Sequence, residues 1–206
     1  MTEVSGADLA ASSPQGAGAL EAFAQLAWAR RTSLQMDLDR DVAPELVQEL
    51  CEIAASAPNH KRTWPWRFCL FTGEGRAALG AAYAAALELA GADGAKITKT
   101  RTKYLRAPAM LLVGSTSSEP GRVLEDGYAV AAALQNILLA ATAAGLASFW
   151  SSPPVLDAPG VLQLAGFPEG TRIVGVVYLG WPARDAETPD RPPVEVGWVT
   201  GIPARP

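Results

Sequence analysis

The sequence predicts a single domain of mixed helices and strands that is organised around one long apolar helix. The first observation is the stretch 125–150, which begins with Glu125 and Asp126 and carries no further charged residue as far as Trp150. The second is the size of the chain: 206 residues, with 49% hydrophobic and 18% charged, are enough to bury one core. The third is a set of short apolar runs of strand length, at residues 68–71, 110–114, 147–150 and 172–179.

The stretch 125–145 carries the signals of a helix. Two acids at its start suit the positive end of a helix dipole, and Gly145 suits the other end. Tyr128, Gln135 and Thr142 recur at steps of seven and form one polar stripe, whereas most of the remaining circumference is apolar. A helix of this kind is surrounded either by protein or by lipid.

We favour protein over lipid for this helix. Its apolar residues are mostly alanine, Gln135 and Asn136 fall near its middle, and its flanks show no Lys/Arg asymmetry. A chain of this size has difficulty covering such a helix on every side. We therefore expect a homodimer that shares the helix, and no membrane insertion.

Composition excludes several classes of function. The net charge of −4 and the pI near 5.1 show no excess of positive charge of the kind with which proteins bind nucleic acid. Cys51 and Cys69 stand in no C-x-x-C or metal-like spacing and are expected to be reduced and buried. Because His60 is the lone histidine, we expect no metal site and no histidine-relay hydrolase. The N-terminus has no basic and apolar signal peptide, so we expect a cytoplasmic protein.

The other elements follow in chain order. Residues 1–18 are rich in Ala, Gly, Ser and Pro and are expected to form a disordered tail, followed by a single domain over 19–206. Further helices are expected at 19–31, from Pro44 to near Ser56, after Gly73-Glu74-Gly75 as far as about Leu89, at about 95–105 and at about 154–165. The proline-rich remainder after Gly180 predicts an extended C-terminal arm, which either hangs free or wraps a neighbour.

The segment 57–67 is expected to be an ordered loop. Its prolines, cations and tryptophans suit neither a helix nor a central strand, and loops of such composition are often functional. Trp64 and Trp66 are both candidates for lining a substrate space, but Trp66 is expected to pack in the core beside the following strand.

Arg30-Arg31-Thr32 allows two interpretations. Two cations at the end of a helix complement its dipole, which would explain both arginines. Two guanidinium groups beside a hydroxyl also suit a bound phosphate. The motif by itself favours the dipole.

The order of several motifs along the chain carries a resemblance to a known family. These motifs are Arg30-Arg31-Thr32, the loop Ala57-Pro58-Asn59-His60-Lys61 before Pro65-Trp66-Arg67-Phe68, a long small-residue helix, Trp150-Ser151-Ser152, and Tyr178-Leu179-Gly180-x-Pro182. Together they resemble the FMN-dependent nitroreductases over about residues 20–182, and most closely a small single-domain subgroup whose loop reads Ala-Pro-Asp/Asn-His-Lys. The resemblance implies an α+β fold with a central, mostly antiparallel sheet flanked by helices. It also implies an intertwined homodimer with two FMN sites at the subunit interface.

The resemblance also implies roles for individual residues. Arg30, Arg31 and Thr32 match the segment that holds the FMN phosphate, and Trp150, Ser151 and Ser152 match the segment that lines the flavin. His60 matches a loop position near the cofactor, and bracing of the loop remains an equal alternative for it. Ser56 and Ser151 stand where relatives can carry arginine, and Arg62, Arg67, Arg184 or Arg191 are candidates to replace those cations. No dedicated catalytic acid or base and no metal ligand is implied.

The implied activity is a ping-pong hydride transfer. FMN takes a hydride from NADH or NADPH and passes electrons to a small acceptor such as a nitroaromatic, a quinone or another conjugated compound. Two alternatives stay open. One is a flavin-binding protein with little or no NAD(P)H turnover, and the other is a cofactor-free or membrane-associated helical protein built on 125–150.

Overall fold

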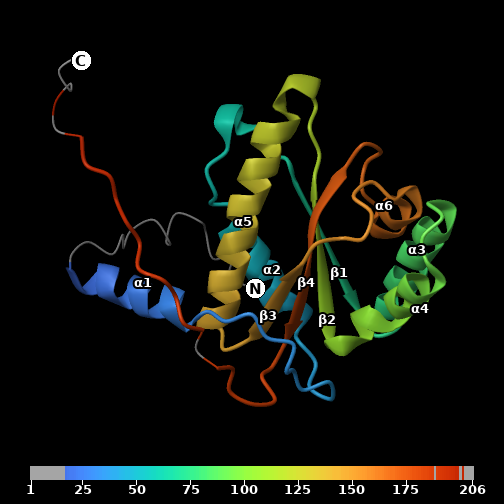
Figure 1. Cartoon of the computed structure of the whole chain (residues 1–206), viewed down its shortest axis with the longest axis horizontal. Coiled ribbons are helices and arrows are strands. Elements are labelled where there is room, and N and C mark those ends of the chain that lie inside the picture. The colour runs from blue at the N-terminus through green and yellow to red at the C-terminus, as the bar shows by residue number, and fades with distance from the viewer. Residues whose placement is uncertain (1–16, 188, 200, 202–206) are drawn as a thin grey trace, which may run out of the picture.

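The computed structural model describes residues 17–187, 189–199 and 201 (Figure 1). Residues 1–16 of the expected N-terminal tail lie outside the described residues, whereas Ala17 and Gly18, which were assigned to that tail, instead begin the first helix. The α-helices are α1 (Ala17–Ala29), α2 (Pro44–Ala54), α3 (Gly75–Leu89), α4 (Gly94–Lys103), α5 (Val123–Ala143) and α6 (Pro159–Ala165). Short 3-10 helices are η1 (His60–Arg62), η2 (Tyr104–Arg106) and η3 (Pro120–Arg122). The strands are β1 (Trp66–Thr72), β2 (Ala109–Ser115), β3 (Ala147–Ser151) and β4 (Arg172–Gly180).

The four strands form one antiparallel sheet in the order β1-β2-β4-β3. All seven residues of β2 are buried, which fits a central strand covered on both faces. The register shifts between Val113 and Gly114, where the ladder with β4 is irregular. The expected α+β fold with a mostly antiparallel sheet and flanking helices is therefore confirmed.

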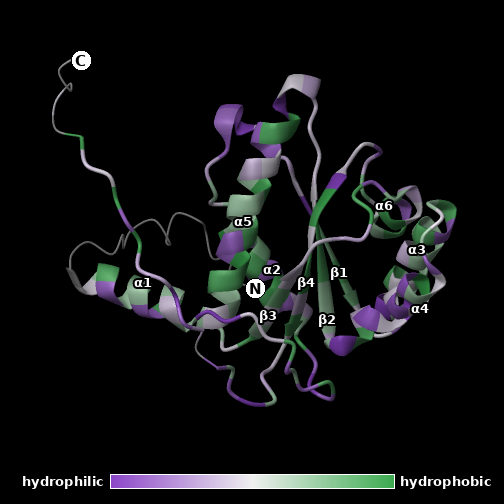
Figure 2. Ribbon diagram, in the orientation of Figure 1, coloured by the Kyte–Doolittle hydropathy of each residue, from purple (hydrophilic) through white to green (hydrophobic). Residues whose placement is uncertain are grey.

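Helices cover both faces of the sheet and create two cores (Figure 1). On one face, α2 and α5 pack on the sheet through residues such as Leu50 and Leu134, both at most 2% exposed. On the other face, α3 and α6 pack through Leu79 and Val161, both fully buried. Figure 2 shows hydrophobic residues along the strands and on the helix sides that face them.

Helix α5 is buried on one side and open on the other. Val130, Ala133, Leu134 and Ile137 are fully buried against the sheet and α2. Leu124 and Tyr128, one turn apart, stay 65% and 66% exposed. In one protomer the helix is thus not surrounded on every side, and Leu124 and the ring of Tyr128 face outward near its start. Among the described residues, no helix is long and apolar enough to cross a membrane.

Several element boundaries differ from the expectations. Helix α6 begins at Pro159 and not near residue 154, because Ala158, the residue before this proline, is extended. Strand β1 begins at Trp66, two residues earlier than expected, because Trp66 already pairs with Ser115. Trp66 also packs against the core, as expected.

The cysteines and the C-terminal arm follow the expectations in part. Cys51 and Cys69 are free but only partly buried, and burial together with Glu52 raises the pKa of Cys51 to about 11.

The described residues after Gly180 form no helix or strand. Apolar side chains of this arm remain open, with Val194 and Trp198 at 87% and 85% exposure.

The close contact between α3 and α4 depends on Gly80. A Cβ atom at this position would lie 2.2 Å from the carbonyl oxygen of Arg101, which is backbone and has little freedom to move. We expect Gly80→Ala to lower the free energy of unfolding by about 2 kcal/mol or more, measured by chemical denaturation. Gly160→Ala is the matched control because no heavy atom lies within 4 Å of its Cβ position, and it should cause no loss. Equal effects of the two changes would contradict this account.

Candidate functional site

The chain leaves α1 in an extended segment that runs beside strand β3. Helix α1 ends at Ala29, and the backbone N–H of Ser33 then donates to the carbonyl of Ser148 at 3.0 Å. Thr32 forms a parallel bridge with Ser148. Two segments far apart in sequence, 30–32 and 150–152, are thereby attached to the same short strand and its continuation.

Arginine side chains gather at this segment. The Arg31 guanidinium donates to the carbonyls of Arg30, at 3.0 Å, and of Trp28, so it caps the end of α1 as the dipole interpretation requires. Arg191 of the C-terminal arm donates to the carbonyl of Arg30 at 3.4 Å. Burial, and then the nearby charges of Arg191 and Arg31, lower the pKa of the Arg30 guanidinium. Among the described residues, no carboxylate forms an ion pair with Arg30 or Arg191.

A polar cavity of about 730 Å³ lies next to this cluster. It contains Thr32 and two further cations, Arg106 and Arg184, together with Asp185 and Glu187. The Arg184 guanidinium donates to the side-chain oxygen of Gln35. Cations and a hydroxyl in a hollow of this size are a suitable donor set for an anion such as a phosphate monoester.

Trp150 lies directly on the sheet. It pairs with Val177 in the antiparallel ladder, and its indole covers Gly175, where a Cβ atom would lie only 2.3 Å from the indole nitrogen. The glycine therefore lets the ring approach the backbone of β4, while 38% of Trp150 stays exposed. Ser151 and Ser152 follow, and the Ser151 hydroxyl donates to the Ser152 carbonyl at 3.2 Å.

Ser56 lies next to the second half of α5, whereas His60 lies next to its first turn. The Ser56 hydroxyl donates to the Ile53 carbonyl at 2.7 Å and accepts from the amide of Asn136 at 3.4 Å. The His60 Nδ1 lies 3.1 Å from a carboxylate oxygen of Glu125, in a pair whose side chains are 62% and 52% exposed. This contact joins the loop to α5, and it leaves both interpretations of His60 open.

The eight sequence-predicted residues thus form two groups within one chain. The Arg30 segment lies near the end of α5, where Arg31 and Thr142 line one small cavity. His60 contacts Glu125 at the start of the same helix. Because Glu125 and Thr142 are 17 residues apart (142 − 125) and the helix rises about 1.5 Å per residue, these two positions are separated by roughly 25 Å. One chain does not bring His60 to the Arg30 segment.

The loop that carries His60 has an unusual backbone. Lys61, Arg62 and Trp64 have φ angles of 63°, 54° and 49°, and they are the described non-glycine residues with positive φ. Each such residue costs roughly 1–2 kcal/mol unless its surroundings hold it. The sequence analysis missed the groups that do so, above all Asp126, which is 2% exposed and accepts hydrogen bonds from two hydroxyls. The only signal was an acid in the first turn of a helix, which we had assigned to the dipole.

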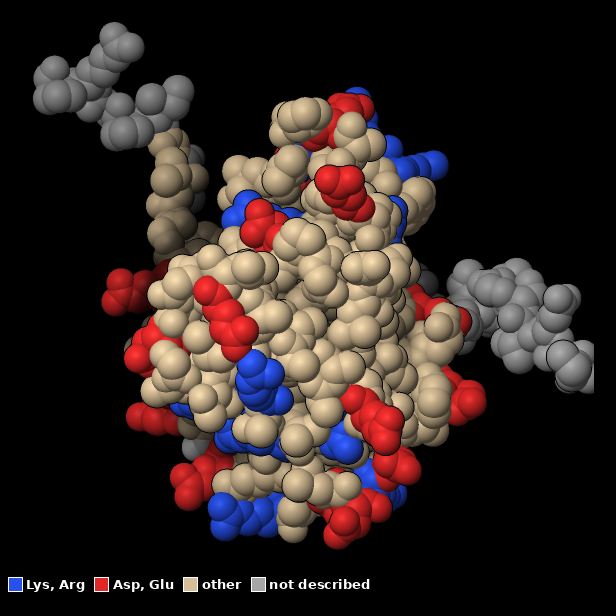
Figure 3. All heavy atoms as spheres, turned by 90° about the vertical axis from the view of Figure 1, so that its right-hand side faces the viewer, with Lys and Arg blue, Asp and Glu red and all other residues tan. Residues whose placement is uncertain are grey.

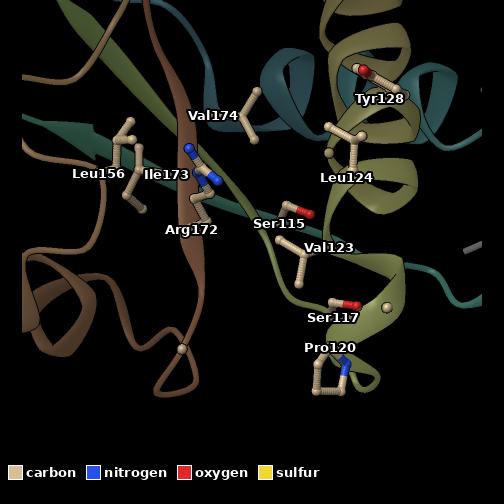
Figure 4. A pocket seen from close by; sticks show the side chains of 13 residues that line it. Ser115, Ser117, Pro120, Val123, Leu124, Tyr128, Leu156, Arg172, Ile173 and Val174 are labelled. Atoms are coloured by element: carbon tan, nitrogen blue, oxygen red, sulfur yellow. The ribbon is translucent and has the colours of Figure 1, made fainter.

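A second cavity, of about 550 Å³, opens at the start of α5 (Figure 4). The residues that point toward it include Ser115 at the end of β2, Ser117 in the loop after it, Leu124 and Tyr128 from α5, and Arg172 from β4. None of the eight sequence-predicted residues lines this cavity. The face of the molecule that lies on the right in Figure 1 is viewed in Figure 3, and it carries acidic and basic side chains without a single dominant patch.

Comparison with known proteins identifies the family. The family model described as "Nitroreductase family" matches residues 28–181 of the chain. The chain belongs to the nitroreductase family. The assignment made from the sequence is thereby confirmed, although the subgroup loop motif is not tested by this match.

Individual members of the nitroreductase family support the assignment. The chain is 32% identical over 158 residues to the Escherichia coli K12 protein named "Putative NAD(P)H nitroreductase YdjA", with 76% of this chain and 86% of that protein covered. A solved nitroreductase-like family protein from Bacillus cereus is 28% identical, with a TM-score of 0.70 and coverage of 93% of this chain and 100% of that chain. A nitroreductase with bound FMN from Bacteroides fragilis shares the fold at 23% identity and a TM-score of 0.67, with 87% of this chain and 98% of that chain covered.

Proposed function

We propose that the protein is an FMN-dependent oxidoreductase of the nitroreductase family. It takes electrons from NADH or NADPH and reduces a nitroaromatic, a quinone or a similar conjugated small molecule in a ping-pong cycle. The names of the relatives support this proposal: the Escherichia coli protein is named for NAD(P)H nitroreductase activity, and the Bacteroides fragilis structure is titled with bound FMN. No catalytic acid or base is assigned, because FMN would supply the hydride-transfer chemistry when bound.

The observation that carries the proposal is the arginine cluster beside β3. Arg30 is partly buried among Arg31 and Arg191, and no described carboxylate pairs with it. Partly buried like charges favour a bound anion, and the phosphate of FMN fits the donors present. Arg30 and Thr32 would hold this phosphate, and Arg31 would fix the segment by capping α1.

The same strand would place the flavin ring. Trp150, Ser151 and Ser152 follow Ser148, the residue to which the phosphate segment is attached. The exposed part of Trp150 supplies an apolar surface that excludes water, and the polar groups of Ser151 and Ser152 are available to the edge of the ring. These residues orient the ring and keep its surroundings dry.

The second group would come from a second copy of the chain. His60 lies too far along α5 to reach the phosphate segment of its own protomer, and Ser56 precedes it by four residues in the chain. Exposed apolar side chains on α1 and α5, including Leu20 at 70%, Trp28 at 66% and Tyr128 at 66%, offer a surface for that copy. We therefore propose a homodimer in which each FMN site is completed by the loop of the partner subunit.

A flavin-binding protein with little turnover remains the second candidate. Ser56 and Ser151, at the two positions where similar proteins can carry arginine, both donate to backbone carbonyls of their own segments. Neither residue supplies a cation to a nicotinamide donor. A protein of this kind would bind FMN, but NADH or NADPH would reduce the bound flavin only slowly.

Absorption spectroscopy separates these functions. We expect the purified protein, loaded with FMN, to show flavin absorption that bleaches rapidly when NADH or NADPH is added without oxygen. The absorption should return when a quinone or nitroaromatic is added. Slow bleaching with both donors would favour the second candidate. A protein that stays colourless after incubation with FMN would contradict both.

The phosphate assignment predicts a selective loss of FMN affinity. Because a hydrogen bond to a charged group contributes about 1.5–3 kcal/mol, we expect Arg30→Ala to weaken FMN binding about ten- to a hundredfold. Binding of riboflavin, which lacks the phosphate, should hardly change. Titration of both flavins against both proteins gives the comparison, with Arg101→Ala on α4 as the matched control that should alter neither affinity. Equal weakening of FMN and riboflavin would show that Arg30 braces the fold.

The dimer predicts that one exposed position on α5 is sensitive to charge. Tyr128 is 66% exposed in the protomer, so Tyr128→Glu should leave the folded chain stable. In a dimer that covers α5, the new carboxylate would be buried without a partner and should cost several kcal/mol. We expect sedimentation to show a dimer at micromolar concentration for the unaltered protein and a folded monomer for the variant. Leu89→Glu, at a position 92% exposed on α3, is the control that should remain dimeric.

A further inference from the structure

A buried carboxylate joins two loops at the start of α5. Asp126 lies in the first turn of the helix and is 2% exposed. One of its oxygens accepts a hydrogen bond from the Thr63 hydroxyl at 2.6 Å, and the other accepts one from the Ser117 hydroxyl, also at 2.6 Å. Thr63 belongs to the loop that carries His60, whereas Ser117 belongs to the loop after β2.

The surroundings of Asp126 are built for a charged group. A buried carboxylate is strongly disfavoured unless it is hydrogen-bonded, and here both oxygens have short hydroxyl donors. The positive end of the α5 dipole adds a favourable field. The buried carboxylate of Asp126 therefore fixes the positions of the Thr63 and Ser117 hydroxyls.

Thr63 connects Asp126 to the loop whose residues have positive φ angles. Its hydroxyl donates to Asp126 and accepts from the side-chain amide of Asn59 at 3.0 Å. The side-chain oxygen of Asn59 in turn accepts from the backbone N–H of Trp64 at 2.8 Å. These contacts enclose Lys61 and Arg62, whose positive φ angles would otherwise relax. The chain Asp126–Thr63–Asn59 thus fixes the backbone between residues 59 and 64.

We propose that Asp126 is a positioning residue which, through Thr63 and Asn59, holds the 59–64 loop in the one conformation that completes the FMN site of the partner subunit. This inference rests on the function and the dimer proposed above. Asp126 itself does not touch the cofactor. Its contribution is to keep His60 and Trp64 at fixed positions on a loop whose own backbone preferences oppose that conformation.

The chain offers a matched pair of substitutions for the test. Thr63→Val and Ser117→Ala each remove one hydroxyl that lies 2.6 Å from the same carboxylate, but only Thr63 belongs to the strained loop. A merely structural role for Asp126 predicts equal consequences for the two changes. A positioning role predicts that only Thr63→Val changes the conformation of the loop and the binding of FMN.

The measurements are hydrogen exchange of residues 59–64 and FMN titration, both on the full-length protein. We expect Thr63→Val to speed exchange in this segment and to weaken FMN binding, each by roughly tenfold, the factor expected from one hydrogen bond to a charged group. Thr63→Ser should restore both values. Ser117→Ala should leave both within about twofold while lowering the midpoint of denaturation to a similar extent as Thr63→Val.

A double-mutant cycle tests whether Asp126 acts through Thr63. We expect Asp126→Asn to reproduce the effects of Thr63→Val, and the added Thr63→Val change to have little further effect in that background. Additive effects of the two changes, or equal effects of Thr63→Val and Ser117→Ala, would overturn the proposal. If the unaltered protein binds no FMN, the proposed function fails and the role toward the cofactor fails with it. The exchange data then still report whether Asp126 holds the loop.

Discussion

The packing of α5 on the antiparallel sheet is the constraint on which the rest of the molecule depends. Its buried side consists of small and branched apolar residues, which let the helix lie close to β2 and β4. Its 21 residues reach from the loop with His60 at one end to the Arg30 segment at the other. The helix therefore fixes where both groups of candidate site residues lie, although it contributes none of them itself.

The two ends of α5 differ in how the charged side chains beside them are compensated. At the end of α5, Arg30 and Arg191 approach one another, and no described carboxylate forms an ion pair with either of them, an arrangement that an anionic ligand would stabilise. At the start of the helix, in contrast, Asp126 is compensated by two hydroxyl groups and requires no ligand. The arginines are suited to binding an anion, whereas Asp126 with its two hydroxyl donors is suited to holding a loop.

Backbone strain is concentrated in the same region as this holding network. The described non-glycine residues with positive φ all lie between residues 61 and 64. Strain of this kind persists only where the surrounding contacts over-determine the conformation. Side-chain hydrogen bonds from Asn59, Thr63 and Asp126 provide such contacts here. The conformation of this loop therefore depends on contacts with neighbouring side chains as well as on its own backbone.

The sequence by itself determined the elements and the family. The charge-free run of α5, the Val/Ile-rich run of β4 and the ordered motifs around Arg30 and His60 are local patterns, and periodicity and composition report them directly. Some boundaries moved because proline or strand pairing intervened, as at Pro159 and Trp66.

Only the tertiary structure decided how these parts meet. It brought Arg191 to the carbonyl of Arg30, placed Asp126 against Thr63, and divided the predicted site between the two ends of α5. The first pair is separated by 161 residues and the second by 63. Such contacts arise from the way the helices pack on the sheet, and no local pattern in the sequence records them.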